Sequence, residues 1–451
     1  MGALACSGPV RPNNAPRADS QSPRYTLPYL YGVAADLENL PVVVLGGGAA
    51  GFFGAIACAE ADPARPVFLL EKTPKLLGKV RVSGGGRCNV THACESAAQL
   101  VQHYPRGGRQ LKDAFRRFGV ADTVAWFAAR GVALKTEADG RMFPVTDSSE
   151  TIARALEEAA RRAGVRVLTR TAADEITVLP EGGFRLTISG EGAAAVGEEV
   201  RAARLLVATG GNPKSGAYDW LRALGHGVAE PVPSLFTFNV PASPLRELPG
   251  VSVPHARVLL AGEKLHYEGP LLITHWGVSG PAVLKLSAWG ARRLHELGYH
   301  GTALVSWLPT HTDDSLRAWA LAFRLENGKK QVAAHPPFGL PARLWRTLTA
   351  EAGLGPDTRW SEVPARAQGR LLELLLRTPL EVRGKTTHKD EFVTCGGISL
   401  NEVSLTTFES RLVPGLFFAG EVLDLDGITG GFNFQAAWTT GFLAGRAMSG
   451  R

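Results

Sequence analysis

Three glycines with the spacing Gly46-x-Gly48-x-x-Gly51 directly follow the apolar run PVVVL. In a strand–turn–helix unit, the first glycine allows a tight turn, the second lets the backbone approach a diphosphate, and the third lets helix and strand pack closely. The N–H groups and the dipole at the start of that helix favour an anion. Glu71 follows a second apolar run, PVFLL, where a carboxylate accepts hydrogen bonds from a ribose diol and repels a 2′-phosphate. The sequence therefore predicts a dinucleotide site that disfavours NADP.

A second stretch, GKVRVSGGGRCNVTH over residues 78–92, combines consecutive glycines with basic side chains and contains no acidic residue. Glycines let a backbone approach a ligand closely, and Lys79, Arg81 or Arg87 can offset the charge of a diphosphate. Asn89 can hydrogen-bond the polar edge of a bound ring system. We expect this stretch to be a loop that runs along the ligand.

A third stretch, LFFAGEVLDLDGITGG over residues 416–431, places an apolar run, an acid and glycines before the helix-forming segment FNFQAAWTTGFLAG. A helix start at this point would stabilise the negative charge that a reduced flavin carries near N1. A protein that binds only NAD would leave this distant motif without a role, so the sequence favours FAD. No second GxGxxG motif is present, which leaves open whether NAD(P)H visits the flavin transiently or electrons come from elsewhere.

The elements that must position these motifs follow an α/β pattern with an interruption. Buried strands are predicted at 41–45, 66–70, 165–169 and 204–208, and helices at 49–60 and 148–163. After about residue 212 the pattern changes to proline-rich segments and strands at 257–260, 271–274 and 302–307, followed by broken helices over 316–376. We predict a discontinuous α/β domain (39–213 and 379–451) and an inserted domain (214–378), helical over 313–376, with a disordered tail at 1–38.

Taken together, the motifs resemble the BaiN/RdsA-type family of FAD-dependent oxidoreductases, also described as aminoacetone oxidase-like. The resemblance spans residues 40–450, and its motifs keep the family's order: GGGAAG with Glu71, GGGRCNVTH, ATGG, THWGVSGPA, TCGGISLNE and GEVLDLDGITGGFNFQAAWTTG. It implies a Rossmann-like FAD domain of the glutathione-reductase-like class with a β-barrel-like and helical insertion. Residues 212–220, NPKSGAYDW, depart from the Ser-Tyr-Pro and Gly-Asp-Gly pattern of relatives, so no role is carried over there.

The motifs and the resemblance together give one set of expected FAD-binding residues. These are Gly46, Gly48, Ala50, Gly51, Glu71, Lys72, Lys79, Gly85, Gly86, Arg87, Asn89, Ala208, Thr209, Gly210, Gly420, Glu421, Gly430, Gly431, Phe432 and Asn433.

Reduction of a carbon–carbon double bond by hydride from flavin N5 also needs an acid that protonates the neighbouring carbon. Cys88, His275 and Cys395 are the candidates. Cys88 follows Arg87 in a stretch of free N–H groups, which favours thiolate character. Each of the three also has an ordinary structural role available, as a small buried side chain or a turn residue, and the sequence leaves this choice open.

Composition limits the class of protein. The chain has 451 residues, 45% of them hydrophobic, which suffices for two or three globular domains. It contains no apolar run of membrane-spanning length, and its five scattered cysteines indicate a reducing, cytoplasmic compartment rather than disulfides. No cluster of histidines and cysteines has metal-ligand spacing. The net charge is +7, and basic residues between Arg106 and Arg117 predict a docked helix with one basic face.

Four functions remain open at this point. The favoured one, implied by the resemblance, is reduction of uridine to dihydrouridine in ribosomal RNA, which a basic surface suits because RNA affinity depends on phosphate neutralisation. The others are reduction of a small unsaturated steroid-like compound, oxidation of an amine, and binding of RNA by a flavoprotein whose FAD is structural.

Overall fold

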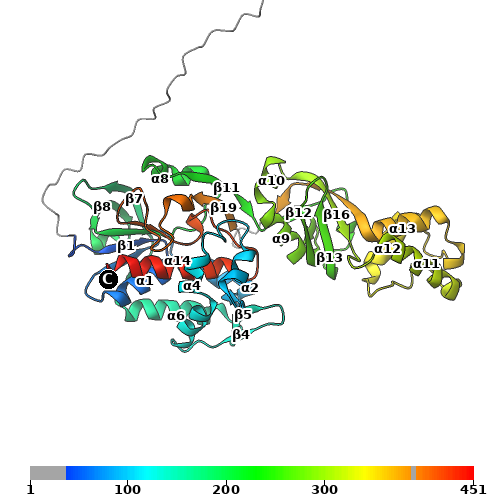
Figure 1. Ribbon diagram of the computed structural model, residues 1–451, viewed down its shortest axis with the longest axis horizontal. Helices are drawn as coiled ribbons and strands as arrows, with labels where there is room; N and C mark the ends of the chain where they lie inside the picture. Colours follow the sequence, from blue (N-terminus) through cyan, green and yellow to red (C-terminus); the bar gives the residue numbers. More distant parts are fainter. Residues whose placement is uncertain (1–36, 387–392, 451) are drawn as a thin grey trace, which may run out of the picture.

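The computed structural model describes residues 37–386 and 393–450 (Figure 1). The tail predicted at 1–38 lies outside the described residues, apart from its last two. Figure 1 shows a larger lobe, which contains both the early and the late parts of the chain, and a narrower part that extends away from it. The narrower part is formed by the middle of the sequence.

A five-stranded parallel sheet forms the centre of the larger lobe, with the order β20-β10-β1-β2-β6. Read in the opposite direction, this is the 3-2-1-4-5 order of doubly wound nucleotide-binding folds, whose order reverses between the first and fourth strands. The predicted buried strands are confirmed. Their bounds are Val42–Leu45 (β1), Val67–Leu70 (β2), Arg166–Leu168 (β6), Arg204–Val207 (β10) and Leu416–Phe418 (β20).

Two helices from opposite ends of the chain, α1 (Ala49–Ala61) and α14 (Phe432–Met448), pack along each other (Figure 1). Glycines at their crossing allow this contact, because a Cβ on Gly445 would lie 2.3 Å from the carbonyl oxygen of Gly54. The last described helix is therefore held against the first. Helix α6 (Ser149–Arg162) packs against α1 and β6, close to the predicted range.

Smaller sheets complete the larger lobe. They are an antiparallel meander of β7 (Thr171–Val178), β8 (Phe184–Gly190) and β9 (Glu199–Ala202), and a sheet of β3 (Thr91–His92), β5 (Arg141–Pro144) and β4 (Leu134–Thr136). A two-stranded ladder of β11 (Val228–Ser234) and β19 (Val393–Ile398) leads towards the narrower part. The divergent 212–220 segment forms η2 (Ser215–Tyr218) and the start of α8 (Asp219–Ala223).

The middle of the chain forms a seven-stranded antiparallel sheet, with the order β17-β16-β13-β14-β15-β12-β18. Its end strands, β17 and β18, are consecutive segments on either side of Gly384, so the sheet returns to itself in the barrel-like manner that the resemblance implied. The bounds are Thr237–Asn239 (β12), Ser252–Leu260 (β13), His266–Ile273 (β14), Gly277–Ser279 (β15), His300–Ser306 (β16), Thr378–Arg383 (β17) and Lys385–Thr386 (β18).

Helices cover this sheet and extend beyond it. Helices α9 (Pro281–Trp289) and α10 (Ala291–Glu296) lie on the side that faces the larger lobe, whereas α11 (Asp313–Asn327), α12 (Ala342–Glu351) and α13 (Ala365–Arg377) form the far end (Figure 1). One hydrophobic core joins residues from 42–221 and 398–448 together with Ala288 of α9, and a second joins residues from 236–382. The division into domains at 214 and 378 stays a prediction.

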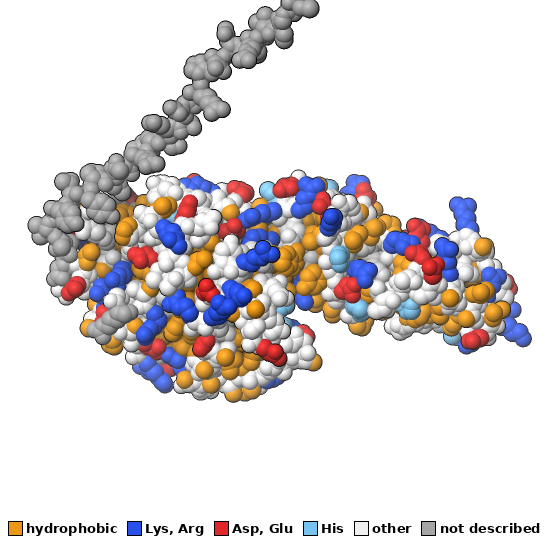
Figure 2. Space-filling model, viewed as in Figure 1, with side chains coloured by type: hydrophobic (Ala, Val, Ile, Leu, Met, Phe, Trp, Pro, Cys, Tyr) orange, Lys and Arg blue, Asp and Glu red, His pale blue; other side chains and the backbone are white. Residues whose placement is uncertain are grey.

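The expected basic helix over 106–117 is wrong in its extent. Helix α4 covers only Lys112–Arg117, and Arg106 lies in the preceding turn, where it is bound to the buried Asp426. Arg116 pairs with Asp113 in the same helix. Figure 2 shows basic side chains spread across the visible face of the larger lobe with acidic ones between them, rather than on one helix.

Candidate functional site: a cleft at the edge of the parallel sheet

A cleft of about 800 Å³ lies at the carboxyl ends of the parallel strands. It is lined by the residues that follow β1, β2, β10 and β20, namely 46–50, Glu71, 208–211 and 419–421. Doubly wound sheets bind nucleotides at this edge, where the strand order reverses. Gly48 and Gly431 both line this cleft, so the early glycine turn and the late helix start face one site, as predicted.

The glycine turn after β1 has the geometry that a diphosphate needs. Gly46 has a φ of +109°, and a Cβ there would lie 2.4 Å from the carbonyl oxygen of Ala208. A Cβ on Gly51 would lie 1.9 Å from the carbonyl oxygen of Gly46, so helix and strand approach too closely for any side chain. At Gly48, by contrast, a Cβ would meet nothing within 4 Å among the described atoms. The open space at the start of α1 suits a bound anion, which the helix dipole favours.

Glu71 lies in the same cleft at the end of β2. Its carboxylate accepts hydrogen bonds from the N–H groups of Gly47 (2.9 Å) and Thr73 (2.8 Å), which fix its position. Each carboxylate oxygen keeps a second lone pair for a ribose hydroxyl. The neighbouring Lys72 is exposed and does not line the cleft, whereas Lys75 does.

The basic stretch after β2 differs from the expected loop. Residues Gly78–Gly86 form α2, a helix that kinks at Ser83–Gly85, where Gly84 and Gly85 have φ values of +59° and +70°. Gly84 and Gly85 line the cleft, but Gly86 does not. A Cβ on Gly85 would meet nothing within 4 Å among the described atoms, which leaves the backbone open to a ligand.

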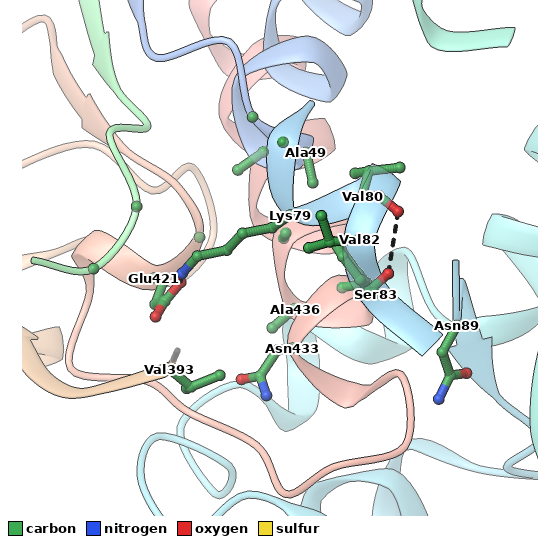
Figure 3. Close-up of a pocket in the computed structure, with 18 of the residues that line it drawn as sticks. Ala49, Lys79, Val80, Val82, Ser83, Asn89, Val393, Glu421, Asn433 and Ala436 are labelled. Atoms are coloured by element: carbon green, nitrogen blue, oxygen red, sulfur yellow. Dashed lines mark hydrogen bonds and ion pairs between the residues drawn. The ribbon is translucent and has the colours of Figure 1, made fainter. Parts of the chain in front are cut away.

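Of the three cations expected to face a diphosphate, the structure places only Lys79 in the cleft. Its Nζ lies 2.6 Å from Oε2 of Glu421, so the side chain reaches across to the residue after β20 (Figure 3). Arg81 pairs with carboxylates of α6. The expectation for Arg87 is corrected, because it pairs with Glu137 at 2.6 Å and its guanidinium lies 4.0 Å from a phenylalanine ring outside the cleft. Carboxylates near these two arginines neutralise them locally.

The late segment supplies the opposite wall. Oε1 of Glu421 accepts from the N–H of Thr394 at 2.7 Å, which holds the carboxylate at the cleft. The helix α14 begins after Gly431, whose φ is +95° and whose hypothetical Cβ would lie 2.6 Å from the backbone of Thr91. Asn433 both accepts from and donates to the backbone of Gly427, at 2.8 and 2.9 Å. These contacts hold the turn before α14 in one shape.

At this wall of the cleft, Asn89 connects the early segment of the chain to the late segment. With its amide oriented to suit its neighbours, it accepts from the N–H of Gly431 and donates to the carbonyl of Thr91, both at 3.0 Å. Phe432, expected at the cofactor, turns away from the cleft and stacks between His92 (4.6 Å) and His103 (4.4 Å). Its ring therefore supports the start of α14 from behind.

None of the three candidate proton donors lines the cleft. Cys88 is fully buried, and burial raises the pKa of its thiol to about 12, so the expected thiolate character is wrong. Cys395 is also buried, and burial raises its pKa to about 11. His275 is exposed, and its backbone carbonyl accepts from Arg246. Burial outweighs a hydrogen bond with Ser83 at Cys88, and it outweighs the nearby Arg106 and Arg292 at Cys395.

Several lining residues were not found from the sequence. Leu235, Thr237, Ser279 and Leu284 reach the cleft from the middle of the chain, and Arg141 reaches it from β5. Of these, only Ser279 lies in a motif, THWGVSGPA, and the others meet the cleft through tertiary packing alone. Thr237 is already engaged, since its hydroxyl accepts from Trp276 and donates to the carbonyl of Thr386. Further lining residues are Thr73, Leu77, Val80, Val82, Ser83, Gly211, Val393, Leu425, Ile428, Thr429, Phe434, Ala436 and Ala437.

The described residues contain no group of three or more His, Cys, Asp or Glu side chains that could hold a metal ion. No helix within 37–386 and 393–450 is long and apolar enough to cross a membrane. The residues that line the cleft, rather than these absences, indicate its ligand. The cleft has open glycine positions, an acid after β2, and walls from both the early and the late segments of the chain. These features define the protein as a dinucleotide-binding flavoprotein of the Rossmann type.

Comparison with known proteins agrees with this class. Residues 40–447 match the family model described as the HI0933-like protein Rossmann domain. The chain is 30% identical over 419 residues to the 3-dehydro-bile acid delta(4,6)-reductase of Clostridium scindens, covering 90% of this chain and 98% of that protein. It is 31% identical to the ribosomal RNA dihydrouridine synthase of Escherichia coli, covering 90% and 96% of the two chains. It is 27% identical to the enzyme of the same name from Haemophilus influenzae, covering 90% and 98%.

The chain belongs to the HI0933-like Rossmann family, whose members are FAD-dependent oxidoreductases of the BaiN/RdsA type. The match to the family model covers both parts of the chain that form the parallel-sheet lobe and the whole segment between them.

Proposed function

We propose that this protein reduces a ring carbon–carbon double bond with electrons from bound FAD, and that its substrate is a uridine of ribosomal RNA. The observation that carries the proposal is the 800 Å³ cleft, which the early and the late segments of the described chain line together with residues of the barrel-like part. The names of the relatives agree in their chemistry, because dihydrouridine synthesis and delta(4,6)-reduction both saturate double bonds in a ring. We also propose NAD(P)H as a transient electron donor and the cytoplasm as the location.

The residues of the cleft divide into a cofactor part and a substrate part. Gly48 and Gly85 leave room for the diphosphate, Lys79 offsets its charge, Glu71 accepts from a ribose, and the start of α14 faces the ring system. When bound, FAD supplies hydride to the substrate. The protein itself must hold the substrate ring flat against the flavin ring and exclude water from the cleft.

The substrate part of the cleft suits a flat ring with a polar edge. Leu235 and Leu284 supply apolar surface, and Ser279 supplies a hydroxyl that has no hydrogen-bond partner among the described residues. Hydride addition to a double bond conjugated with a carbonyl places negative charge on the carbonyl oxygen, and a hydroxyl donor stabilises that charge. We therefore propose Ser279 as the donor to a carbonyl oxygen of the substrate.

Mass spectrometry of ribosomal RNA tests the proposal. A strain that lacks the gene should lose the mass of two added hydrogens at one uridine, and the wild-type gene should restore it. The Ser279→Ala variant should restore it poorly while keeping its flavin absorption spectrum, and Ser243→Ala, at a 3₁₀-helix cap in the narrower part, serves as the control. Unchanged RNA in the deletion strain would refute the RNA substrate. A purified protein that stays colourless after incubation with FAD would refute the cofactor.

Reduction of a small steroid-like compound is the second candidate. The 30% identity to a bile acid reductase over almost the whole of that protein favours it. Oxidation of reduced flavin by a bile acid dienone, measured without RNA, would support this function if it is fast and uridine reduction is absent. RNA binding without any turnover would instead favour a structural role for FAD.

A further inference from the structure

A second cleft, of about 660 Å³, lies beside the FAD cleft and is separate from it. The two clefts share their walls. In one wall Leu425 lines the FAD cleft and its neighbour Asp424 lines the second cleft, and in the other wall α9 presents Leu284 to the first and Trp289 to the second. A volume of this size is within the range of about 300–1,000 Å³ that small-molecule sites have. We call it the arginine cleft, lined by 101–102, 104–110, 289, 292, 399–401 and 424.

The arginine cleft contains a cation that the protein does not neutralise. Arg109 is exposed, and no carboxylate or other side-chain partner binds its guanidinium among the described residues. A second arginine, Arg292, is bound through one nitrogen to both oxygens of Asp424, at 2.8 and 2.9 Å. Its side chain is still 48% exposed, so other guanidinium N–H groups stay accessible to a ligand. The cleft therefore favours an anion beside its one carboxylate.

Aromatic and amide side chains accompany these cations. Trp289 is 41% exposed, although large aromatic side chains are normally well buried. The side chains of Gln102, Gln110 and Asn401 are exposed, and no hydrogen-bond partner for their amides occurs in the part of the chain that the structure describes. Amides donate and accept at once, which matches the edge of a nucleobase, whereas an indole ring matches its face.

The arginine cleft is held in shape by a buried ion pair. Arg106 binds Asp426, which is fully buried and also accepts from Ser234 at 2.9 Å. A further nitrogen of Arg106 donates to the carbonyl of Ala288 at 2.7 Å, directly before Trp289. One side chain thus connects the early segment, the late segment and the end of α9. The backbone that carries the indole is therefore held in place.

We propose that the arginine cleft binds one nucleotide of single-stranded RNA, with its base stacked on Trp289 and its phosphate on Arg109. This inference rests on the proposed function, because it places a nucleotide that flanks the reacting uridine on the other side of the shared wall. Single-stranded RNA is the appropriate form, since its bases can unstack and leave both faces and edges free. A phosphate of that strand would give Arg109 the anion that no described residue supplies.

Binding of a labelled, short single-stranded RNA to the holoenzyme, followed by fluorescence anisotropy at several salt concentrations, tests this inference. The Arg109→Gln variant should bind more weakly and lose about 0.7 from the slope of log K against log salt, the value for one phosphate of a single strand. Trp289→Ala should weaken binding roughly 5- to 150-fold, the range for one stacked base, and Trp289→Phe should recover most of it.

Matched controls lie elsewhere on the molecule. Arg185 of β8 is also exposed and has no side-chain partner among the described residues, and Phe338 is 41% exposed, as is Trp289. Arg185→Gln and Phe338→Ala should bind RNA as the wild type does. All variants should keep the flavin absorption spectrum, which shows that the FAD cleft is intact.

Two results would overturn the inference, and they differ from each other. If Arg109→Gln and Trp289→Ala bind RNA as their controls do, while uridine is still reduced, the cleft assignment is wrong and the proposed function stands. If the wild-type holoenzyme binds no RNA even at low salt, both the cleft assignment and the RNA substrate are wrong.

Discussion

Replacement of Gly48 by alanine should separate cofactor binding from folding. Gly48 precedes α1 with φ −93° and ψ −171°, an extended conformation that alanine adopts without strain. A Cβ there meets nothing within 4 Å among the described atoms, so the apoprotein has space for it. The same methyl group projects into the space that a diphosphate would occupy at the start of the helix.

The expected magnitudes follow from this geometry. Alanine is a poorer N-cap residue than glycine, which costs about 0.5–1.5 kcal/mol, but it restricts the unfolded chain, which returns about 0.4–1 kcal/mol. The free energy of unfolding of the apoprotein should therefore change by less than about 1 kcal/mol. Displacing the diphosphate should remove one or two charge-assisted hydrogen bonds of about 1.5–3 kcal/mol each, which corresponds to a loss of FAD affinity of roughly 10-fold to 10,000-fold.

Gly51→Ala is the control that should behave in the opposite way. Its Cβ would lie 1.9 Å from a backbone oxygen, so α1 must shift from β1, and such overpacking costs about 1–3 kcal/mol in the apoprotein. Urea unfolding of both apoproteins and titration of flavin fluorescence with each would measure the two effects. The reasoning is refuted if Gly48→Ala binds FAD as tightly as the wild type, or destabilises the apoprotein as much as Gly51→Ala does.

Three further predictions concern ionisable groups. Asp426→Asn leaves the 11%-exposed Arg106 without its counterion and should lower the free energy of unfolding, measured with urea, by about 3–5 kcal/mol. As a control, Asp113→Asn in an exposed ion pair should change that free energy by less than about 0.5 kcal/mol. Equal effects of the two substitutions would contradict the role of burial. Burial raises the pKa of Cys88 from 9.0 to about 12, so the folded thiol keeps a proton that the unfolded chain loses in this window. The contribution of Cys88 to the free energy of unfolding is complete below pH 9 and should fall by about 1.4 kcal/mol per pH unit from there to about pH 12. A Cys88→Ala variant whose stability has the same pH dependence as that of the wild type would disprove this. Lys79→Gln should weaken FAD binding about 10-fold with a lower salt dependence, measured by flavin fluorescence, because it removes one charge-assisted contact; an unchanged salt dependence would place Lys79 away from the diphosphate.

The sequence predicted the parallel-sheet lobe well because its signals are local. A run such as Val42–Leu45 is apolar at every position, as a strand covered on both faces must be, and the glycine spacing after it has few other uses. The early glycine motif and the late glycine motif could be assigned to one site because a bound dinucleotide explains both of them. The helix at the start of the basic stretch was missed, since consecutive glycines favour a loop and the packing of Val80 is a tertiary contact. At Ser83–Gly85 the backbone is non-helical, as the glycines indicate.

The candidate proton donors show the limit of sequence reasoning. Cys88 is next to an arginine in the chain, but its side chain points into the core while that of Arg87 pairs with Glu137 outside it. Adjacent residues share a backbone and not an environment, so the pKa of a thiol depends on what the fold places around its side chain. The same holds for Ser279, whose motif THWGVSGPA did not assign it to the cleft, and for Trp289, which lies in no motif; packing brings both to the walls of the two clefts.

What the sequence alone determined was the positions of the parallel strands along the chain, the glycine positions that a diphosphate requires, and the kind of cofactor. These depend on hydrophobic periodicity and backbone sterics, which act between near neighbours in the chain. Which cations face the ligand, which thiols stay protonated and which side chains meet the substrate were decided by the tertiary structure. Electrostatic and desolvation energies depend on distances through space, and residues 342 positions apart, such as Lys79 and Glu421, can come to lie 2.6 Å from each other.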